Sequence, residues 1–285
     1  MEIVEVNQLP LLPPRRADSN KGDYGKVLVV AGSRGMAGAA VLCGSAALRA
    51  GAGLVRVAMP KEIQPTVVAG NPCYTTIALP QEKHGRLNTS ALVELRRLAR
   101  DNDVVALGPG LGRGPGLSFL VASFLQAAVI PVVLDADGLN AVVGQPLRHA
   151  GPLVITPHPG EFARLLGRST QEVQSERRAL AVRFAQDHGL IVVLKGHGTL
   201  VTDGRRMFTN ATGNPGMATG GTGDVLTGVI AALIGQRLAP FDAAVLGVHV
   251  HGLAGDLARD QLGEVGMTAA DLLDTLPATL RLLGK

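Results

Sequence analysis

A glycine-rich run is the part of this sequence best suited to chemistry. Residues 214–224 are NPGMATGGTGD, and the apolar helical pattern VLTGVI follows at once. Glycine lacks a Cβ atom, so consecutive backbone N–H groups can converge on one point, and the positive end of the following helix dipole faces the same point. The run therefore predicts a turn that holds the negative charge of a phosphoryl group.

Asp224 closes this run and is predicted to lie in the first turn of the helix, beside the anion site. A carboxylate there can accept the proton of a substrate hydroxyl while the hydroxyl oxygen attacks a phosphoryl group. A second interpretation is open for an isolated Gly-x-Gly-Asp: the acid only complements the helix dipole, which contributes about 0.3–1 kcal/mol. The length of the glycine-rich run favours the catalytic interpretation.

Other polar residues follow apolar runs that we predict to be strands. Lys195 precedes Gly196, so its ammonium group could reach phosphate oxygens, or it is simply a solvated charge. His158 lies between two prolines, which either hold its imidazole over a ligand or leave it in a surface loop. Asp135 and Asp137 could contact a metal or a ribose, or could begin the next helix.

Histidine and cysteine spacings do not predict a metal centre. His249 and His251 are two residues apart in an apolar helical pattern, which points them to different faces. Cys43 lies in an Ala/Gly-rich helical pattern and Cys73 follows a proline, so neither a disulfide framework nor a cysteine cluster is expected. This cysteine usage favours a reducing cytoplasm.

The elements that must position these residues alternate between short apolar strands and helical patterns. This alternation predicts an α/β fold with a mostly parallel sheet between helix layers. The strands are expected at 27–31, 54–58, 104–107, 131–134, 153–156 and 191–194, with a hairpin from 199–202 and 206–209 around Asp203-Gly204. The helices are expected at 36–50, 89–100, 117–127, 170–188, 223–234 and 241–260. Residues 10–14 and 72–86 are predicted to be an entry arm and a surface excursion.

Loops at the carboxyl ends of parallel strands meet in one crevice, where open α/β sheets bind ligands. The loops 32–39, 108–112 and 156–161 each follow a predicted strand. We therefore expect all three to face the same ligand as the glycine-rich run.

Length and composition narrow the class of protein. A chain of 285 residues can form one large α/β domain, and no Pro/Ser-rich linker divides it, so 1–285 is predicted to be a single domain. Aromatic residues make up only 3%, and the net charge is +4 with no basic runs, which favours a small anionic ligand over nucleic acid. No signal peptide or membrane-spanning run is apparent, so a soluble protein is expected.

Several motifs together resemble one known family. The Gly-Thr-Gly-Asp turn at 221–224 is similar to the anion-hole motif of ribokinase-like kinases. The runs KGDYGK (21–26), ALGPGLG (106–112), LDADGLN (134–140), TPHPGE (156–161) and VLKG (193–196) are, in this order, similar to the NAD(P)H-hydrate dehydratases. The resemblance covers nearly all of the chain and implies a ribokinase-like three-layer sandwich with helices on both faces of the sheet.

The resemblance implies a lyase that repairs a damaged metabolite. The terminal phosphoryl group of ADP (or ATP) is transferred to the hydroxyl of hydrated NADH or NADPH, S epimer, and phosphate then leaves as the double bond returns. AMP (or ADP) is released. By position, the substrate contacts are Ala39, Gly110, His158 and Asp224, and Asp224 is the catalytic base. The nucleotide contacts by position are Lys195, Gly196, His197, Gly198, Thr199 and Gly223.

The family pattern also implies partners and a metal. Glu161 stands where related kinases carry an acid that organises Mg²⁺, although a carboxylate that only opens a helix at 161–166 is an open alternative. Single-domain bacterial members use ADP, and the family suggests a homotetramer. Many members carry a fused epimerase domain, for which there is no room before Lys21, so a separate epimerase is expected.

Two other functions remain open at this stage. The same turn serves small-alcohol and vitamin kinases of this fold, and a non-catalytic nucleotide sensor would share the binding loops. A Rossmann oxidoreductase is not favoured, because no Gly-x-Gly-x-x-Gly opens a helix after a strand. A P-loop is excluded, because no Gly-x₄-Gly-Lys-Ser/Thr occurs.

Overall fold

Ten strands form one sheet in the order β1-β10-β9-β8-β7-β6-β5-β2-β3-β4. The computed structural model describes residues 3–283; residues 1, 2, 284 and 285, which include the start of the polar amino-terminal segment, lie outside the described residues. The strands are β1 (Val4–Glu5), β2 (Lys26–Val30), β3 (Leu54–Pro60), β4 (Thr75–Leu79), β5 (Val104–Leu107), β6 (Val132–Leu134), β7 (Leu153–Ile155), β8 (Ile191–Leu194), β9 (Leu200–Thr202) and β10 (Arg206–Thr209). Neighbours from β8 to β4 are parallel, whereas β9 is antiparallel to both β8 and β10.

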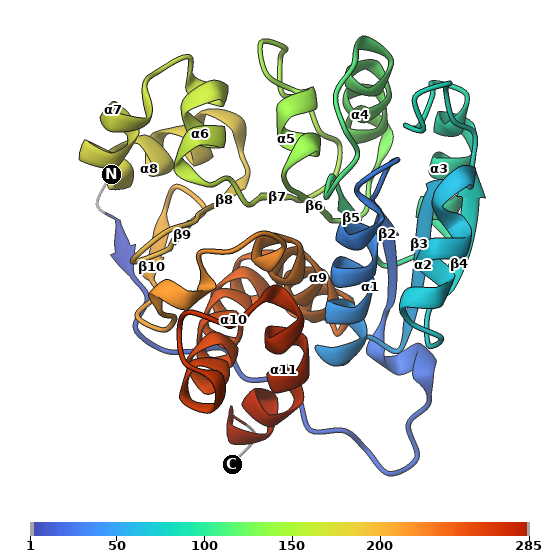
Figure 1. Ribbon diagram of the computed structural model, residues 1–285. Helices are drawn as coiled ribbons and strands as arrows, with labels where there is room; N and C mark the ends of the chain where they lie inside the picture. Colours follow the sequence, from blue (N-terminus) through green and yellow to red (C-terminus); the bar gives the residue numbers. More distant parts are fainter. Residues whose placement is uncertain (1–2, 284–285) are drawn as a thin grey trace.

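Helices cover both faces of this sheet (Figure 1). One layer holds α1 (Ala37–Arg49), α2 (Gln64–Gly70), α9 (Thr222–Gly235), α10 (Pro240–Leu262) and α11 (Ala269–Leu283), which share one aliphatic core. The other layer holds α3 (Ala91–Arg100), α4 (Pro115–Ala127), α5 (Asp137–Ala141), α6 (Pro159–Leu166), α7 (Thr170–Ser175) and α8 (Arg177–His188), with a second core. Short 3₁₀ turns lie at η1 (Lys21–Tyr24), η2 (Lys61–Ile63) and η3 (Pro215–Met217). This is the predicted three-layer arrangement.

The central strands are buried on both faces, which explains their continuous apolar sequences. Val27 to Val30 are all fully buried, and so are Val104 to Leu107, so alternate side chains along each strand enter opposite cores. Because aromatic residues are few, these cores consist mainly of Val, Leu, Ile and Ala.

The sheet has a topological switch point between β2 and β5. From β2 the chain moves outward to β3 and β4, whereas from β5 it moves in the opposite direction to β6, β7 and β8. The loops that leave these two adjacent strands therefore diverge above the sheet, which is where open α/β sheets bind ligands.

The strands and most helices agree with the sequence expectations, and the β9–β10 hairpin around Gly204 is confirmed. Two expectations are wrong. The predicted helix 170–188 is two helices, because Glu176 leaves helical geometry at φ −121° and ψ 24°. The excursion 72–86 contains strand β4, which pairs in parallel with β3. Helices α2 and α11 and strand β1 were not predicted.

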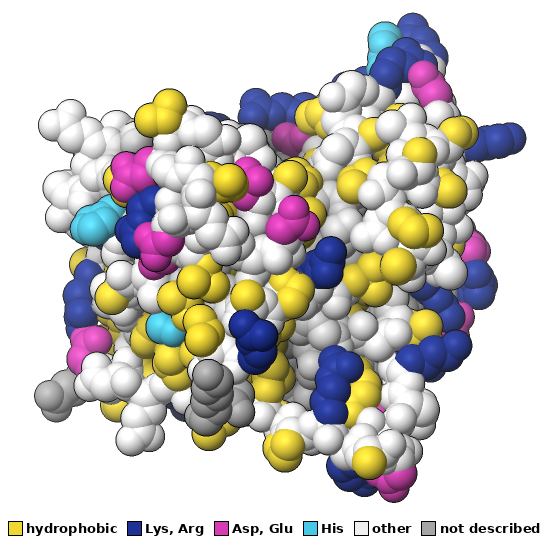
Figure 2. Space-filling view, turned by 60° about the horizontal axis from the view of Figure 1, so that its bottom comes forward, with side chains coloured by type: hydrophobic (Ala, Val, Ile, Leu, Met, Phe, Trp, Pro, Cys, Tyr) yellow, Lys and Arg dark blue, Asp and Glu magenta, His cyan; other side chains and the backbone are white. Residues whose placement is uncertain are grey.

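Surface charge is distributed in small groups. On the face shown in Figure 2, Lys and Arg side chains are scattered, and Asp or Glu side chains lie beside several of them. Within residues 3–283, no helix has both the length and the apolar character needed to cross a bilayer.

Candidate active site

The loops after β2 and β5 meet at the switch point. The N–H of Gly32 donates to the carbonyl of Pro109 at 2.8 Å, and the Ser33 hydroxyl donates to the carbonyl of Gly110 at 2.8 Å. A Cβ atom on Gly110 would lie 2.8 Å from the Cβ of Ala39, and Gly110 has a φ of +64°. Ala39 and Gly110, 71 residues apart in sequence, are therefore neighbours on one surface, as their shared predicted role requires.

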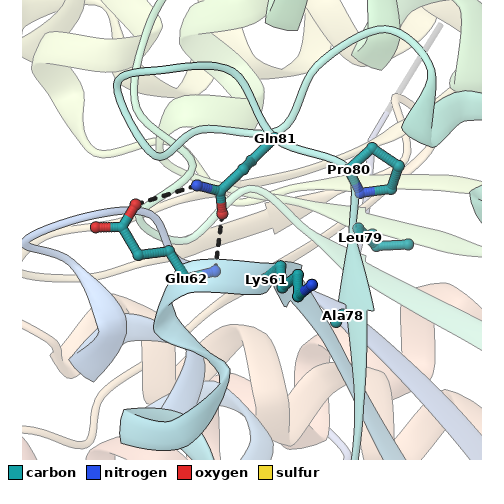
Figure 3. A pocket seen from close by; sticks show the side chains of 6 residues that line it. All are labelled: Lys61, Glu62, Ala78, Leu79, Pro80 and Gln81. Atoms are coloured by element: carbon teal, nitrogen blue, oxygen red, sulfur yellow. Dashed lines mark hydrogen bonds between the residues drawn. The ribbon is translucent and has the colours of Figure 1, made fainter.

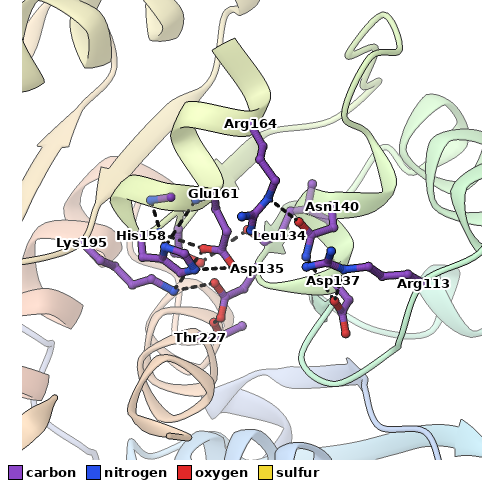
Figure 4. A network of polar contacts seen from close by, with 12 residues as sticks. Arg113, Leu134, Asp135, Asp137, Asn140, His158, Glu161, Arg164, Lys195 and Thr227 are labelled. Atoms are coloured by element: carbon purple, nitrogen blue, oxygen red, sulfur yellow. Dashed lines mark hydrogen bonds and ion pairs between the residues drawn. The ribbon is translucent and has the colours of Figure 1, made fainter. Parts of the chain in front are cut away.

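A buried ion pair lies farther along the carboxyl edge of the sheet (Figure 4). Asp135 follows β6, its side chain is 1% exposed, and its Oδ1 accepts a hydrogen bond from Lys195 Nζ at 2.8 Å. Its Oδ2 accepts a hydrogen bond from Thr227 Oγ1 at 2.8 Å. Both carboxylate oxygens thus have a partner, which a buried charge requires.

Lys195 is held as a cation by surrounding carboxylates. Burial by itself lowers the pKa of this ammonium group, but the charges of Asp135, Glu161 and Asp224 raise it, and the net pKa lies above the usual range. The side chain is 19% exposed, so the charge is close to the surface of the crevice. Lys195 is therefore a partly buried cation paired with Asp135 and not a freely solvated lysine, while its contact with a phosphate stays a prediction.

The amino end of helix α9 lies against this ion pair. Gly221 precedes the helix with a φ of +93°, and a Cβ on Gly223 would lie 3.1 Å from Lys195 Nζ. Thr227, one turn into the helix, bonds to Asp135. The first turn of α9, whose N–H groups have no partner within the helix, therefore lies beside the Lys195 ammonium.

Asp224 is the third residue of α9, as the sequence predicts. Burial is the main cause that raises the pKa of its carboxyl group to about 7, and the negative charge of Asp135 adds to the effect. The ammonium of Lys195 acts in the opposite direction. A carboxyl group with a pKa near neutrality can exchange a proton with a substrate at physiological pH.

His158 and Glu161 form a capping box at the start of α6. The Nδ1 atom of His158 accepts hydrogen bonds from the N–H groups of Gly160 and Glu161 at 3.1 and 3.3 Å, and Glu161 Oε2 accepts one from the N–H of His158 at 2.9 Å. Because Nδ1 is an acceptor, the proton of the neutral ring is on Nε2. Burial, Lys195 and Arg164 lower the pKa of His158, which favours this neutral form.

Both side chains therefore have a helix-capping role, and a ligand or metal contact by either one stays a prediction. The Nδ1 atom of His158 caps the helix, its Nε2 lies 3.5 Å from Glu161 Oε1, and the side chain is 51% exposed. Glu161 opens α6 and also lies 4.0 Å from Lys195 Nζ, with its side chain only 7% exposed. Asp137 likewise begins α5, and its Oδ2 accepts a hydrogen bond from the N–H of Gly112 at 2.8 Å.

The predicted nucleotide loop joins β8 to β9. It is anchored from α8 by Arg177, whose guanidinium donates to the carbonyls of Leu194 and Lys195 at 3.1 to 3.3 Å. The hydroxyl of Thr199 donates to the carbonyl of Gly196, and Gly196 has a φ of +123°. Residues 195–199 thus form a short, braced loop that starts at the buried lysine.

Sequence reasoning missed three residues that position the site. Thr227 and Arg177 act through the contacts just described, and His251 Nε2 bonds to the carbonyl of Thr222 at 2.8 Å. Burial lowers the pKa of His251 to about 4, so the ring is neutral and donates this bond. The spacing of Thr227 four residues after Gly223 was a signal, because it puts both on one helix face; nothing marked Arg177.

Comparison with known proteins first defines the class. The fold matches a ribokinase-like superfamily protein from Enterococcus faecalis with a TM-score of 0.82, 26% identity, and coverage of 95% of this chain and 92% of the other. It also matches an ADP/ATP-dependent NAD(P)H-hydrate dehydratase from Bacillus subtilis, co-crystallised with ATP/Mg²⁺, with a TM-score of 0.82, 33% identity, and coverage of 95% and 94%. The chain has a ribokinase-like fold.

The sequence then defines the family. The family model for NAD(P)H-hydrate dehydratase matches residues 27–278, and the chain belongs to this family. An ADP-dependent (S)-NAD(P)H-hydrate dehydratase from Cenarchaeum symbiosum is 36% identical over 95% of this chain and 93% of its own length. A bifunctional NAD(P)H-hydrate repair enzyme from Moorella thermoacetica is 46% identical over 95% of this chain. The chain spans about half of that enzyme's length, 52%.

Proposed function

We propose that this chain restores hydrated NADH and NADPH, in the S form, to NADH and NADPH. ADP (or ATP) is consumed, and AMP (or ADP) and phosphate are released. The Cenarchaeum symbiosum relative, an ADP-dependent (S)-NAD(P)H-hydrate dehydratase that matches this chain along almost its full length, supports the substrate and its configuration. Because that relative is ADP-dependent, ADP is our first choice of phosphoryl donor.

One observation carries the proposal: Asp224 combines a raised pKa with a place in the first turn of α9. Its carboxyl group has a pKa of about 7, and free N–H groups and the Lys195 ammonium lie beside it. This arrangement suits the acceptance of a hydroxyl proton next to a phosphoryl group that is gaining charge. A structural acid that only complements a helix dipole has no need of a partly buried site.

The reaction consists of two steps. First, Asp224 accepts the proton of the substrate hydroxyl, the oxygen forms a bond to the terminal phosphorus of the nucleotide, and the bond from that phosphorus to the bridging oxygen breaks. The N–H groups at residues 220–223 and Lys195 stabilise the charge on the phosphoryl oxygens. Second, the carbon–oxygen bond breaks, phosphate leaves, and loss of a ring proton restores the double bond. A poor leaving group, hydroxide, is thereby replaced by a good one.

We assign the binding roles by position in the crevice. Ala39, Gly110 and the exposed part of the His158 imidazole contact the hydrated dinucleotide; the first two are neighbours at the switch point. The loop from Lys195 through Gly196, His197, Gly198 and Thr199 holds the adenine nucleotide, and Gly223 contacts its phosphate. The close approach of Lys195 Nζ to Gly223 supports one phosphate site shared by the loop and α9.

Mg²⁺ is proposed as a companion of the nucleotide. Within residues 3–283 no group of three or more His, Cys, Asp or Glu side chains could hold a metal alone. Mg²⁺ needs only one or two carboxylates when phosphates supply other ligands, and Glu161 offers one near Lys195. When bound, Mg²⁺ would neutralise phosphate charge. The residues present fit such a shared site, with Glu161 as the proposed protein contact.

We propose a homotetramer in the cytoplasm, with residues 1–285 as one dehydratase domain. The repair enzyme of Moorella thermoacetica is bifunctional. We propose that interconversion of the two hydrate epimers takes place outside residues 1–285.

The test is an assay of purified protein with hydrated NADH, Mg²⁺, and either ADP or ATP. We expect absorbance at 340 nm to increase with ADP, together with stoichiometric AMP and phosphate. A small-alcohol kinase would instead consume nucleotide with a vitamin alcohol and leave the hydrate unchanged. A nucleotide sensor would bind ADP without consuming it. Either of those results would refute the proposed function.

A further inference from the structure

A hollow of about 460 Å³ lies beside the Ala39–Gly110 contact. Three loops line it: the one after β2, the connection from β4 to α3, and the loop after β5. The polar and glycine residues in its wall are Ser33, Arg34, His84, Arg86, Gly112 and Arg113. Neither the dehydration chemistry nor the nucleotide loop makes use of these side chains.

Arg34 is held in place but keeps donors free. Its Nε and Nη2 donate to the two carboxylate oxygens of Glu62 at 2.7 and 2.6 Å. Glu62 is fixed in turn by Gln81, which accepts from its N–H at 2.8 Å and donates to its Oε2 at 3.1 Å (Figure 3). Within the described part of the chain, Arg34 Nη1 donates no hydrogen bond to protein. A braced guanidinium with free N–H groups is suited to an oxyanion.

Arg86 has a similar arrangement. Its Nε donates to Glu82 Oε1 at 2.9 Å, and its Nη1 donates to the carbonyl of Arg113. Its Nη2 has no acceptor among residues 3–283. The side chain of Arg113 is 68% exposed, and its only ion pair within the described residues is with Asp137, at 3.6 Å. Three guanidinium groups thus retain N–H donors around one hollow.

Two glycines allow these arginines to approach. A Cβ on Gly85 would lie 2.6 Å from the Cβ of Arg34, and a Cβ on Gly112 would lie 2.9 Å from Arg86 Cδ. Both glycines have positive φ, +75° and +80°. The N–H of Arg34 also donates to the carbonyl of Gly85 at 3.1 Å. The backbone of the separate loops is therefore shaped so that the charges converge.

The hollow adjoins the proposed substrate surface. Ser33, in its wall, donates to the carbonyl of Gly110, and Gly112 is two residues farther along the same loop. A long ligand that contacts Ala39 and Gly110 with one end can reach the arginines with another.

We propose that this hollow binds a phosphate of the hydrated dinucleotide. The site is distinct from the amino end of α9, which serves the phosphates of ADP, and the proposal rests on the proposed function. The phosphate has two possible sources in the ligand: the pyrophosphate shared by the NADH and NADPH forms, or the 2′-phosphate carried by the NADPH form alone. In either case the arginines contribute to substrate affinity and not to the chemical step.

The test compares Arg34→Gln, Arg113→Gln and the double variant with Arg183→Gln. Arg183 is a matched control because its side chain is 79% exposed on α8, away from the hollow. The kcat/KM values are measured with hydrated NADH and with hydrated NADPH at saturating ADP. We expect a loss of about tenfold for each arginine, carried by KM with kcat unchanged, and no loss for the control.

The pattern of loss identifies the phosphate. Equal losses for both substrates assign the pyrophosphate, whereas a loss confined to hydrated NADPH assigns the 2′-phosphate. If the unmodified protein is active and the arginine variants have the same kcat/KM as Arg183→Gln on both substrates, the phosphate subsite is rejected while the proposed function stands. If the unmodified protein converts neither hydrate, the proposed function fails. Calorimetric titration with NADPH and NADH then decides the subsite alone, and equal affinities of all variants reject it.

Discussion

Asp224 is an acid in an environment that opposes its charge. Burial and the nearby Asp135 both favour the protonated form, and Lys195 only partly offsets them. Such a group is costly to keep in a folded protein, which makes sense where a proton must be accepted. At neutral pH its carboxyl group is divided between the two protonation states.

The rate should therefore depend on pH in a defined direction. Since the pKa of Asp224 is about 7 and only the carboxylate accepts a proton, kcat/KM should increase with pH through about 7. Well below this pKa we expect a change of about tenfold per pH unit. The check is a profile from pH 5.5 to 8.5 with hydrated NADH. A flat acidic limb would contradict the assignment of Asp224 as base.

Lys195 should matter mainly for nucleotide binding. Lys195→Met removes the cation beside Gly223, and we expect calorimetry to show ADP affinity about 10–100-fold weaker. Because this change leaves Asp135 buried and unpaired, the double variant Asp135→Asn/Lys195→Met provides a folded comparison. Lys61→Met, at an exposed lysine, is the control. Unchanged ADP affinity in both site variants would remove Lys195 from the nucleotide site.

Helix α9 is the element that combines the proposed anion site with the proposed base. Its first turn presents N–H groups and Asp224, its second turn presents Thr227 to Asp135, and its remaining residues are buried against α1, α10 and the sheet. His251 of α10 fixes the carbonyl of Thr222 at the helix start. The position of the phosphate site is thus set by packing of a whole helix.

Gly223→Ala should separate stability from binding. Alanine favours a helix over glycine by roughly 0.4–1 kcal/mol, but its methyl group would lie 3.1 Å from Lys195 Nζ, within the proposed phosphate site. We expect an equal or higher melting temperature with weaker ADP binding. Gly116→Ala, at the same second position of α4, should leave binding unchanged. Unaltered ADP affinity in Gly223→Ala would mean that the phosphate lies elsewhere.

Most elements could be predicted from the sequence because the central strands are uniformly apolar and their helices lie between glycine or proline stops. Helix α11 was missed because Pro277, inside it, is typical of a helix end. Strand β4 was missed because it is a partly exposed edge strand that follows an irregular segment. The break at Glu176 carries no glycine or proline signal.

The site residues followed from motif order, but their contacts did not. Nothing in the spacing of Asp135, Lys195 and Thr227 shows that they form one network, because three different elements bring them together. The use of the half-exposed His158 side chain as a helix cap also depends on the local geometry of α6. The sequence motifs indicate which chemical groups the site contains, whereas the tertiary fold determines which of these groups form hydrogen bonds or ion pairs.

The whole molecule places its ligand loops on one edge of the sheet. The chain leaves β2 and β5 in opposite directions, so the loops after these two strands diverge. Ala39 and Gly110 are neighbours at this point. The loops after β6, β7 and β8 extend this edge toward α9. A long substrate and a nucleotide can therefore approach the same helix end from two sides.

The free energy of unfolding should depend on pH because the carboxyl pKa of Asp224 is raised in the folded protein. The folded state has a raised carboxyl pKa, so it binds more protons than the unfolded state between about pH 4 and 7, and unfolding free energy decreases as pH increases through this range. Asp224→Asn removes the group whose titration causes this decrease in unfolding free energy. We expect the variant's advantage in thermal or urea unfolding to grow by on the order of 2 kcal/mol from pH 5 to 8. Asp274→Asn, at an exposed site, should show no such trend; a pH-independent difference for Asp224→Asn would contradict the raised pKa.

The most direct measurement is turnover of hydrated NADH by Asp224→Asn alongside its affinity for ADP. Asparagine keeps the shape of the side chain but cannot accept the hydroxyl proton. We predict that kcat falls by about 10²–10⁴-fold or more while calorimetric ADP affinity stays within about twofold. Turnover close to that of the unmodified protein would show that another group takes the proton and would overturn the proposed chemistry at α9.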